Sequence, residues 1–220
     1  MNILFDLDGT LTDSYQGITK SISHALSILG RIPPPQESLT WCVGPPLKKS
    51  LSLLLDSEDE ELVSEALAAF RERFRAVGMF ENEVYSGIPR MLDALQQQAH
   101  TLYVATSKPV VFADKIVEHF GLNRYFQGIY GSELDGTRAD KTSLMLHLLT
   151  CEDIDQADAT MVGDRKHDMI GARANGVRGI GVLWGYGTKK ELEASGACTC
   201  CSSPSDLIDV FNDTSTFNKI

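Results

Sequence analysis

Two aspartates stand two residues apart at the end of a short apolar run near the N-terminus. Ile3-Leu4-Phe5 leads into Asp6-Leu7-Asp8-Gly9-Thr10. In an extended segment side chains two apart point the same way, so the run predicts a strand from which Asp6 and Asp8 project together. Such a pair can supply a nucleophilic carboxylate and a second carboxylate for proton transfer. The same residues also fit an Asx turn at Asp8-Gly9.

A second acidic pair follows the apolar residues Met161-Val162. Asp164 is expected at the end of that strand, and Asp168 lies one helical turn later, so both carboxylates would face the same rim. Clustered carboxylates repel one another unless a cation neutralises them, and hard oxygen ligands favour Mg²⁺. His167 lies between them, but the other candidate ligands are oxygens, so we do not expect it to bind the metal.

Hydroxyl groups and a lysine follow two further expected strand ends. Thr106-Ser107 precedes Lys108-Pro109, and Pro109 suits the first position of a helix, where free N–H groups bind anions. Lys141 opens another helix, a position that the helix dipole disfavours for a cation, which favours an anion-binding role. Each feature alone also fits a helix cap or a surface lysine. Together with the aspartates they predict phosphoryl transfer through an aspartyl-phosphate.

Short apolar runs alternate with helical patterns along the chain. Continuous apolar runs suit strands that are buried on both faces, and their alternation with helices predicts an α/β fold with a doubly wound parallel sheet. We expect strands over 3–6, 101–106, 128–130, 160–162 and 179–183, and helices over 90–98, 109–120, 142–149 and 168–175.

More than ninety residues separate the first expected strand from the second, and none of them forms a convincing strand pattern. A parallel crossover needs only about a dozen, so the excess predicts an insertion. Ile18, Ile22 and Leu26 recur at helical spacing, which indicates that the insertion is helical. We expect it to span 14–85, with hinges near Asp13 and 85–87, and to lie over the carboxyl ends of the strands, where ligands bind in such sheets.

In order and separation, the segments 6–10, 106, 141 and 163–168 resemble the four motifs of the haloacid-dehalogenase (HAD) superfamily of phosphatases. The resemblance implies a Rossmann-like core formed by 1–13 and 86–220, and a type-1 helical cap formed by 14–85. Within that cap, 43–47, 70–74 and 80–87 resemble the branch that holds bacterial phosphoglycolate phosphatases and 5′-nucleotidase-like phosphatases.

The resemblance assigns roles to the acidic residues. Asp6 would attack phosphorus, and Asp8 would protonate the leaving oxygen and then accept a proton from water. Mg²⁺ would be bound by the Asp6 carboxylate, the Asp8 backbone carbonyl and Asp164. Asp168 would hold the metal through water or orient its other ligands.

The resemblance also implies phosphate-binding and specificity residues. Thr106, Ser107 and Lys141 would hold the phosphoryl oxygens. Lys48, in a Gly-Pro-Pro loop of the cap, is the first candidate for contact with the leaving group, and Lys49 is the alternate. Both lysines also fit the role of solvated surface charges.

Arg71, Arg73 and Arg75 recur at a spacing of two and therefore do not share one helix face. We accordingly expect them to pair mainly with the acidic run 58–61 or to face solvent, and not to form a substrate clamp.

The main functional hypothesis is a Mg²⁺-dependent phosphatase of small phosphomonoesters, similar to phosphoglycolate phosphatase. The alternatives are a 5′-nucleotidase-like or broad-specificity phosphatase and, less favoured, a sugar phosphomutase of the β-phosphoglucomutase type. A receiver-type signalling domain would place its phosphorylated aspartate on a later strand and needs no insertion. An inactive binding scaffold is disfavoured by the complete set of candidate residues.

The composition indicates which binding partners and which cellular compartment to expect. The 220 residues carry 30 acidic and 20 basic side chains, a formal net charge of −10, which disfavours nucleic acid and anionic membranes. No apolar stretch approaches the roughly 20 residues of a membrane span. The N-terminus has no basic signal-peptide region, so we expect a cytoplasmic protein. We expect the protein to be a monomer or a homodimer. An odd count of five cysteines argues against a disulfide framework, and the cluster at 198–201 is expected to have a structural or incidental role.

Overall fold

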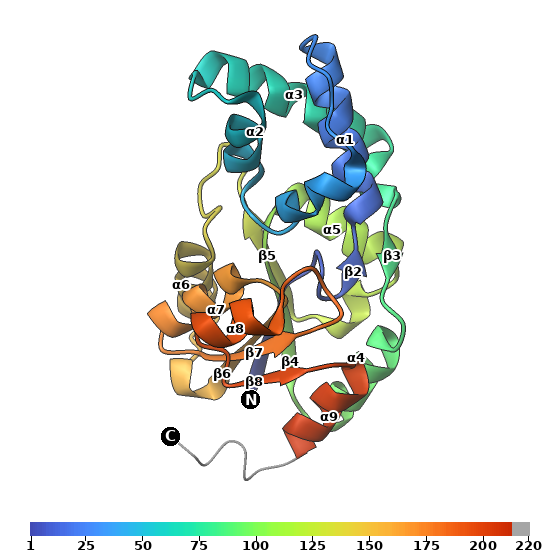
Figure 1. Ribbon diagram of the computed structural model, residues 1–220. Helices are drawn as coiled ribbons and strands as arrows, with labels where there is room; N and C mark the ends of the chain where they lie inside the picture. Colours follow the sequence, from blue (N-terminus) through green and yellow to red (C-terminus); the bar gives the residue numbers. More distant parts are fainter. Residues whose placement is uncertain (213–220) are drawn as a thin grey trace.

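The computed structural model describes residues 1–212 and contains a six-stranded parallel sheet with the strand order β5-β4-β1-β6-β7-β8 (Figure 1). This arrangement confirms the predicted α/β fold. The strands are β1 (Asn2–Phe5), β4 (Thr101–Pro109), β5 (Gly128–Ser132), β6 (Ala159–Gly163), β7 (Arg178–Val182) and β8 (Thr199–Cys201).

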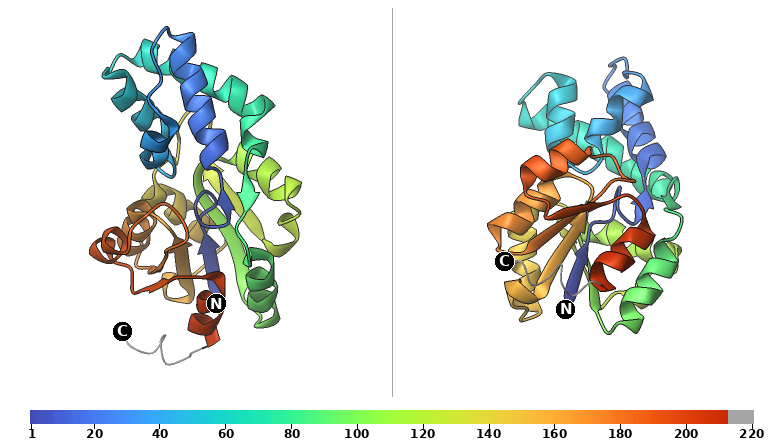
Figure 2. Two further views of the ribbon diagram at one scale, coloured as in Figure 1. Left: turned by 45° about the vertical axis from the view of Figure 1, so that its right-hand side comes forward. Right: turned by 60° about the horizontal axis from the view of Figure 1, so that its bottom comes forward.

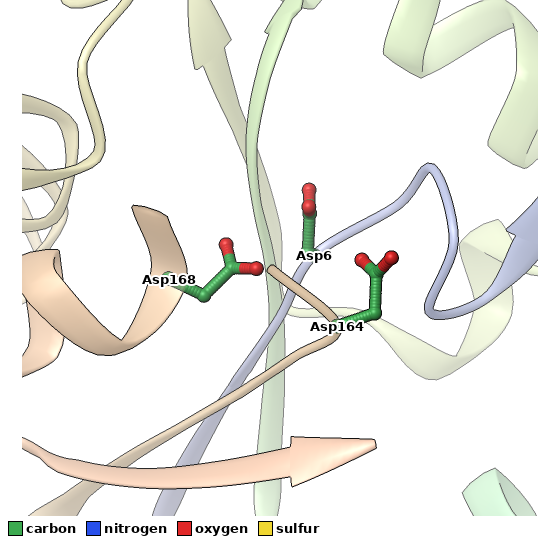
Figure 3. A group of neighbouring side chains, drawn as sticks. All are labelled: Asp6, Asp164 and Asp168. Carbon is green, nitrogen blue, oxygen red and sulfur yellow. The ribbon is translucent and has the colours of Figure 1, made fainter. Parts of the chain in front are cut away.

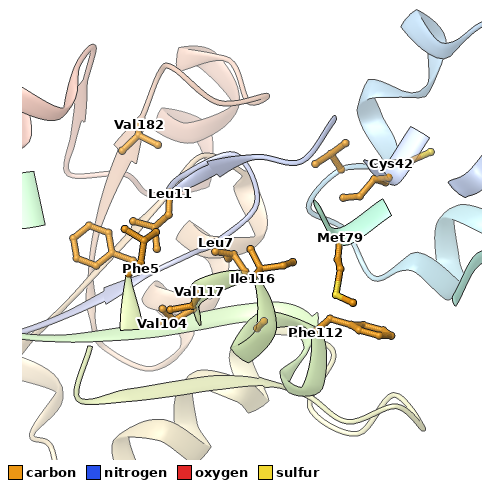
Figure 4. Packing of buried hydrophobic residues seen from close by; sticks show 14 of the residues in the cluster. Phe5, Leu7, Leu11, Cys42, Met79, Val104, Phe112, Ile116, Val117 and Val182 are labelled. Carbon is orange, nitrogen blue, oxygen red and sulfur yellow. The ribbon is translucent and has the colours of Figure 1, made fainter. Parts of the chain in front are cut away.

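Helices cover both faces of the sheet, as Figure 2 shows. Successive side chains of β1 pack on opposite faces of the sheet: Ile3 and Phe5 belong to one apolar cluster, and Leu4 belongs to the other. Figure 4 shows the larger cluster, which continues from the sheet towards the helical insertion. The helices of the sheet layers are α4 (Ile88–Gln97), α5 (Val110–His119), α6 (Lys141–Cys151), α7 (Lys166–Ala174), α8 (Lys189–Ser195) and α9 (Pro204–Asn212).

A helical insertion lies between β1 and β4, above the carboxyl ends of the central strands (Figure 1). Its helices α1 and α3 pack against each other, and α2 packs against α3. The division into 1–13 plus 86–220 and 14–85 stays a prediction. The elements of the insertion are α1 (Tyr15–Ile28), η1 (Gln36–Cys42), α2 (Leu47–Leu55), α3 (Glu60–Ala76) and η2 (Gly78–Phe80).

The expectation that this stretch contains no strand was wrong. Two short strands, β2 (Thr12–Asp13) and β3 (Glu83–Val84), pair antiparallel where the chain enters and leaves the insertion. Two residues are too few to produce a periodic pattern, which explains why the sequence did not reveal them.

The cysteine cluster lies mostly in an unexpected element, the edge strand β8. Cys201 is buried in the main apolar cluster, and the backbone N–H of Cys198 donates to Gly179 O at 2.8 Å. All five cysteines are free thiols. The segment therefore has a structural place in the sheet.

Among the described residues, no helix is long and apolar enough to cross a membrane.

Candidate active site

Asp6 follows β1 directly and is 3% exposed. Its carboxylate oxygen Oδ1 accepts a hydrogen bond from the Leu7 N–H at 2.7 Å. Strand β6 pairs with β1 so that Phe5 lies opposite Val162, which brings Asp164 beside Asp6. Gly9 turns the chain at φ +87°, and a Cβ there would lie 2.3 Å from Asp164 Oδ2, so this close approach requires glycine.

Three buried carboxylates converge at this edge of the sheet. Oxygens of Asp6, Asp164 and Asp168 lie within 4.8 Å of one another (Figure 3). Asp164 Oδ2 accepts the Tyr186 N–H at 2.8 Å, and Asp168 Oδ2 accepts the Arg165 N–H at 3.0 Å. These backbone contacts fix the orientation of both carboxylates.

Lys141, the first residue of α6, joins two members of this cluster. Its Nζ lies 2.9 Å from Asp6 Oδ1 and 2.7 Å from Asp168 Oδ1, and it donates to Ala105 O at 2.6 Å. Burial lowers the pKa of Lys141, but the charges of Asp168 and Asp6 outweigh it, and the pKa is raised. The ammonium group therefore stays charged between the two carboxylates.

The remaining negative charge is only partly balanced. Burial raises the pKa of Asp6 to about 6 against the opposing charge of Lys141, with Asp168 adding to the rise. Burial and the charges of Asp168 and Asp6 also raise the pKa of Asp164 well above its ordinary value. Four buried aspartates, including Asp8, face two buried lysines. The excess charge and the all-oxygen donor set fit a hard divalent cation.

Asp8 has a different partner from Asp6. Lys108 Nζ lies 2.9 Å from Asp8 Oδ1 and 2.8 Å from Asp8 Oδ2, and both side chains are less than 10% exposed. The ammonium group also lies 4.6 Å from the centre of the Phe74 ring on α3. The sequence pattern did not assign Lys108 a role in the site. Its place directly after the Thr106-Ser107 strand end was the one available signal.

The other residues predicted to bind phosphate lie beside these aspartates. Thr106 is 1% exposed, and its Oγ1 accepts the Lys108 N–H at 3.3 Å. The Ser107 carbonyl accepts the Ser132 hydroxyl at 2.9 Å. The register of β4 against β5 shifts between Thr106 and Pro109, so the strand is irregular where Ser107 and Lys108 lie.

A cleft that opens to solvent separates the sheet edge from the insertion. Asp6, Asp8, Thr106, Ser107 and Lys108 lie along its polar side. Its opposite wall is apolar and includes Pro45, Pro46, Leu47, Leu67, Phe70 and Phe74.

Lys48 also lines the cleft, although its side chain is 59% exposed and its Nζ lies 3.5 Å from Glu60 Oε1. Lys49, the alternate, is not among the lining residues.

The expectation for the arginines of α3 was wrong in two respects. Arg73 Nη1 pairs with Glu81 Oε2 at 2.8 Å instead of with the acidic run 58–61. Arg71 lines the cleft, and its Nη2 donates to Leu134 O at 2.5 Å. The spacing argument correctly separates these side chains onto different faces, but it does not identify the segments that those faces meet.

Residues 3–182 match the family described as haloacid dehalogenase-like hydrolase. With this fold and this cluster of aspartates and lysines, the chain belongs to that family. It is a phosphatase of the family, a phosphoric monoester hydrolase.

Curated relatives of the chain carry different names. A 5′-nucleotidase from Pseudomonas aeruginosa is 48% identical over 95% of this chain and 94% of its own length. Tyrosine-protein kinase PtkA from Mycobacterium tuberculosis is 40% identical over 84% of this chain and 62% of its own length. A phosphoglycolate phosphatase from Agrobacterium fabrum is 33% identical over 83% of this chain and 80% of its own length.

A crystal structure of a predicted phosphatase from Clostridium acetobutylicum has the same fold. It superposes with a TM-score of 0.93 at 42% identity, over 96% of this chain and 98% of that one.

Proposed function

We propose that this protein hydrolyses nucleoside 5′-monophosphates through a phosphoaspartate on Asp6. The observation that carries the proposal is the place of Asp6: it is buried, its Oδ1 lies 2.9 Å from Lys141 Nζ, and it lines a cleft whose opposite wall is apolar. The 5′-nucleotidase relative at 48% identity supports the substrate class.

The choice of substrate departs from the main hypothesis drawn from the sequence. The phosphoglycolate phosphatase relative is 33% identical, well below the 5′-nucleotidase. A glycolate leaving group has two carbons and a carboxylate, and it offers little surface to an apolar wall that includes Phe70 and Leu67. A base and a ribose offer much more contact area. The 5′-nucleotidase alternative is therefore better supported.

In the proposed reaction, the Asp6 carboxylate attacks phosphorus, and the bond from phosphorus to the nucleoside 5′-oxygen breaks. Asp8 gives a proton to that departing oxygen, and then accepts a proton from the water that hydrolyses the phosphoaspartate. Thr106, Ser107 and Lys141 hold the phosphoryl oxygens as charge develops on them. The products are the nucleoside and inorganic phosphate.

We propose Mg²⁺ as the cation for the acidic cluster. Asp6, Asp164 and the Asp8 backbone carbonyl would hold it. Both Asp168 oxygens already have protein partners, Lys141 and the Arg165 N–H, which suits a role in orienting the other ligands. A bound Mg²⁺ would supply positive charge to the phosphoryl oxygens.

Lys48 is proposed to contact the leaving group from the rim of the cleft, where its Nζ pairs with exposed Glu60. Because that ion pair is exposed, little free energy is lost when Lys48 exchanges Glu60 for a substrate group.

The proposal is tested by measuring phosphate release in Mg²⁺ from UMP, AMP and phosphoglycolate. We expect kcat/KM to be at least about tenfold higher for the better nucleotide than for phosphoglycolate. A preference for phosphoglycolate would overturn the substrate class, and no release from any substrate would overturn the hydrolysis. Transfer of phosphate from ATP to tyrosine without hydrolysis would instead favour the activity named for the mycobacterial relative.

A further inference from the structure

Arg165 lies between the two aspartates of the last motif, but its side chain serves another part of the molecule. The Nη1 atom donates to Val43 O in the helical insertion at 2.6 Å, and the Nε atom donates to Glu191 Oε1 at 3.1 Å. The side chain is only 11% exposed. The guanidinium thus joins α8, which carries Glu191, to the backbone of the insertion.

The insertion is shaped to receive this arginine. Gly44 has φ +100°, a conformation that favours glycine, and a Cβ there would lie 3.0 Å from Arg165 Cγ. The next residues, Pro45, Pro46 and Leu47, line the cleft. The bond to Val43 O therefore fixes the start of the segment that forms one wall of the cleft.

The core side of the contact is also fixed. Glu191 Oε1 accepts both the Arg165 Nε–H and the Lys166 N–H, the latter at 2.9 Å. Thr188 Oγ1 in turn accepts the Glu191 N–H at 3.2 Å at the start of α8. The arginine is therefore held at one end by the core and presents its other end to the insertion.

We propose that Arg165 is a positioning residue that holds 43–47 as a wall against the leaving group of the substrate. The inference rests on the proposed function, because it takes the leaving group to be a nucleoside. It adds a residue with no role in the chemistry itself. The separate bond from Arg71 to Leu134 O joins the insertion to the core at another point, so loss of Arg165 should release the wall and leave the insertion attached.

The test compares two substrates that share the phosphoryl group and differ in the leaving group: UMP and acetyl phosphate. Arg165→Met removes both the charge and the hydrogen bonds. Arg165→Lys keeps the charge near Asp164 and Asp168, but its single ammonium replaces the two-ended guanidinium. Arg173→Met, at an exposed position on α7, the helix that Arg165 precedes, is the matched control.

We expect both Arg165 variants to lower kcat/KM for UMP about tenfold, the effect of losing a buried hydrogen bond to the wall, and to do so mainly through KM. Acetyl phosphate should change less than about twofold, because its leaving group does not reach the wall. Arg173→Met should match the wild type with both substrates.

Equal losses with the two substrates in both Arg165 variants would overturn the proposal. Wild-type behaviour of Arg165→Lys beside a defective Arg165→Met would overturn it too, since that result assigns the effect to charge alone. Failure of the wild-type protein to hydrolyse either substrate would instead count against the proposed function.

Discussion

Lys108 and Asp8 form a buried ion pair that joins the ends of β4 and β1. The Lys108 ammonium lies 2.9 and 2.8 Å from the two Asp8 oxygens and 4.6 Å from the centre of the Phe74 ring. Asp8, the proposed acid–base residue, is thus oriented by Lys108 of the core. Lys108 also contacts the insertion through Phe74. Asp8 is correspondingly absent from the carboxylate cluster of Asp6, Asp164 and Asp168.

Removal of this partner should slow turnover without removing the nucleophile. We expect Lys108→Met to lower kcat with UMP by about 10- to 100-fold, because Asp8 loses its fixed orientation in the proton-transfer steps. Steady-state phosphate release measures the effect. Lys115→Met, an exposed lysine on the following helix, is the control and should leave kcat unchanged. Unchanged kcat in Lys108→Met would show that Asp8 does not depend on this contact.

Substitution of the nucleophile should abolish hydrolysis and leave the fold intact. We expect Asp6→Asn to lower phosphate release by about 1000-fold or more, because an amide cannot form the phosphoenzyme. Circular dichroism should be unchanged, since asparagine has nearly the same shape and removes one charge from a crowded acidic cluster. Asp93→Asn, at an exposed site on α4, is the matched control. Activity close to wild type in Asp6→Asn would contradict the proposed mechanism.

The raised pKa of Asp6 predicts a pH-dependent stability of the metal-free protein. Asp6 has a pKa of about 6 in the fold, against an ordinary value of 3.8. The folded protein therefore binds this proton more tightly than the unfolded chain does. As pH rises from about 4 to about 6, the titration of Asp6 lowers the free energy of unfolding, so the fold becomes less stable.

This effect is measured by urea unfolding in EDTA at about pH 5 and pH 7. The gain in stability of Asp6→Asn over wild type should be larger at the higher pH, by about 1 kcal/mol. Comparing the two proteins at each pH cancels the titration of histidines and surface carboxylates. An equal difference at both pH values would mean that Asp6 does not titrate in this window.

Cation binding should stabilise the folded protein through the acidic cluster. We expect added Mg²⁺ to raise the Tm of wild type by several degrees, because the ion binds the folded state and neutralises the excess of buried negative charge. Asp164→Asn should lose most of this shift, because it removes a proposed ligand. Thermal unfolding with and without EDTA measures it, and an identical shift in both proteins would place the cation elsewhere.

Residue types and local spacing were sufficient to predict five of the six strands of the parallel sheet and the convergence of their polar residues. Asp6, Thr106 and Asp164 each follow or end an apolar run, and parallel strands bring their carboxyl ends to one edge. The long interval without strand signals was enough to predict the insertion, because a parallel crossover is far shorter. These inferences depend on the direction of one strand or helix, which neighbouring residues along the chain determine.

Only the tertiary structure decided which partners these side chains meet. Three contacts each join segments more than sixty residues apart: Lys108 with Asp8, Arg165 with Val43, and Arg71 with Leu134. Strand order and the place of the insertion over the sheet edge bring these segments together. Local periodicity reports the face on which a side chain lies, whereas long-range packing determines what that face touches.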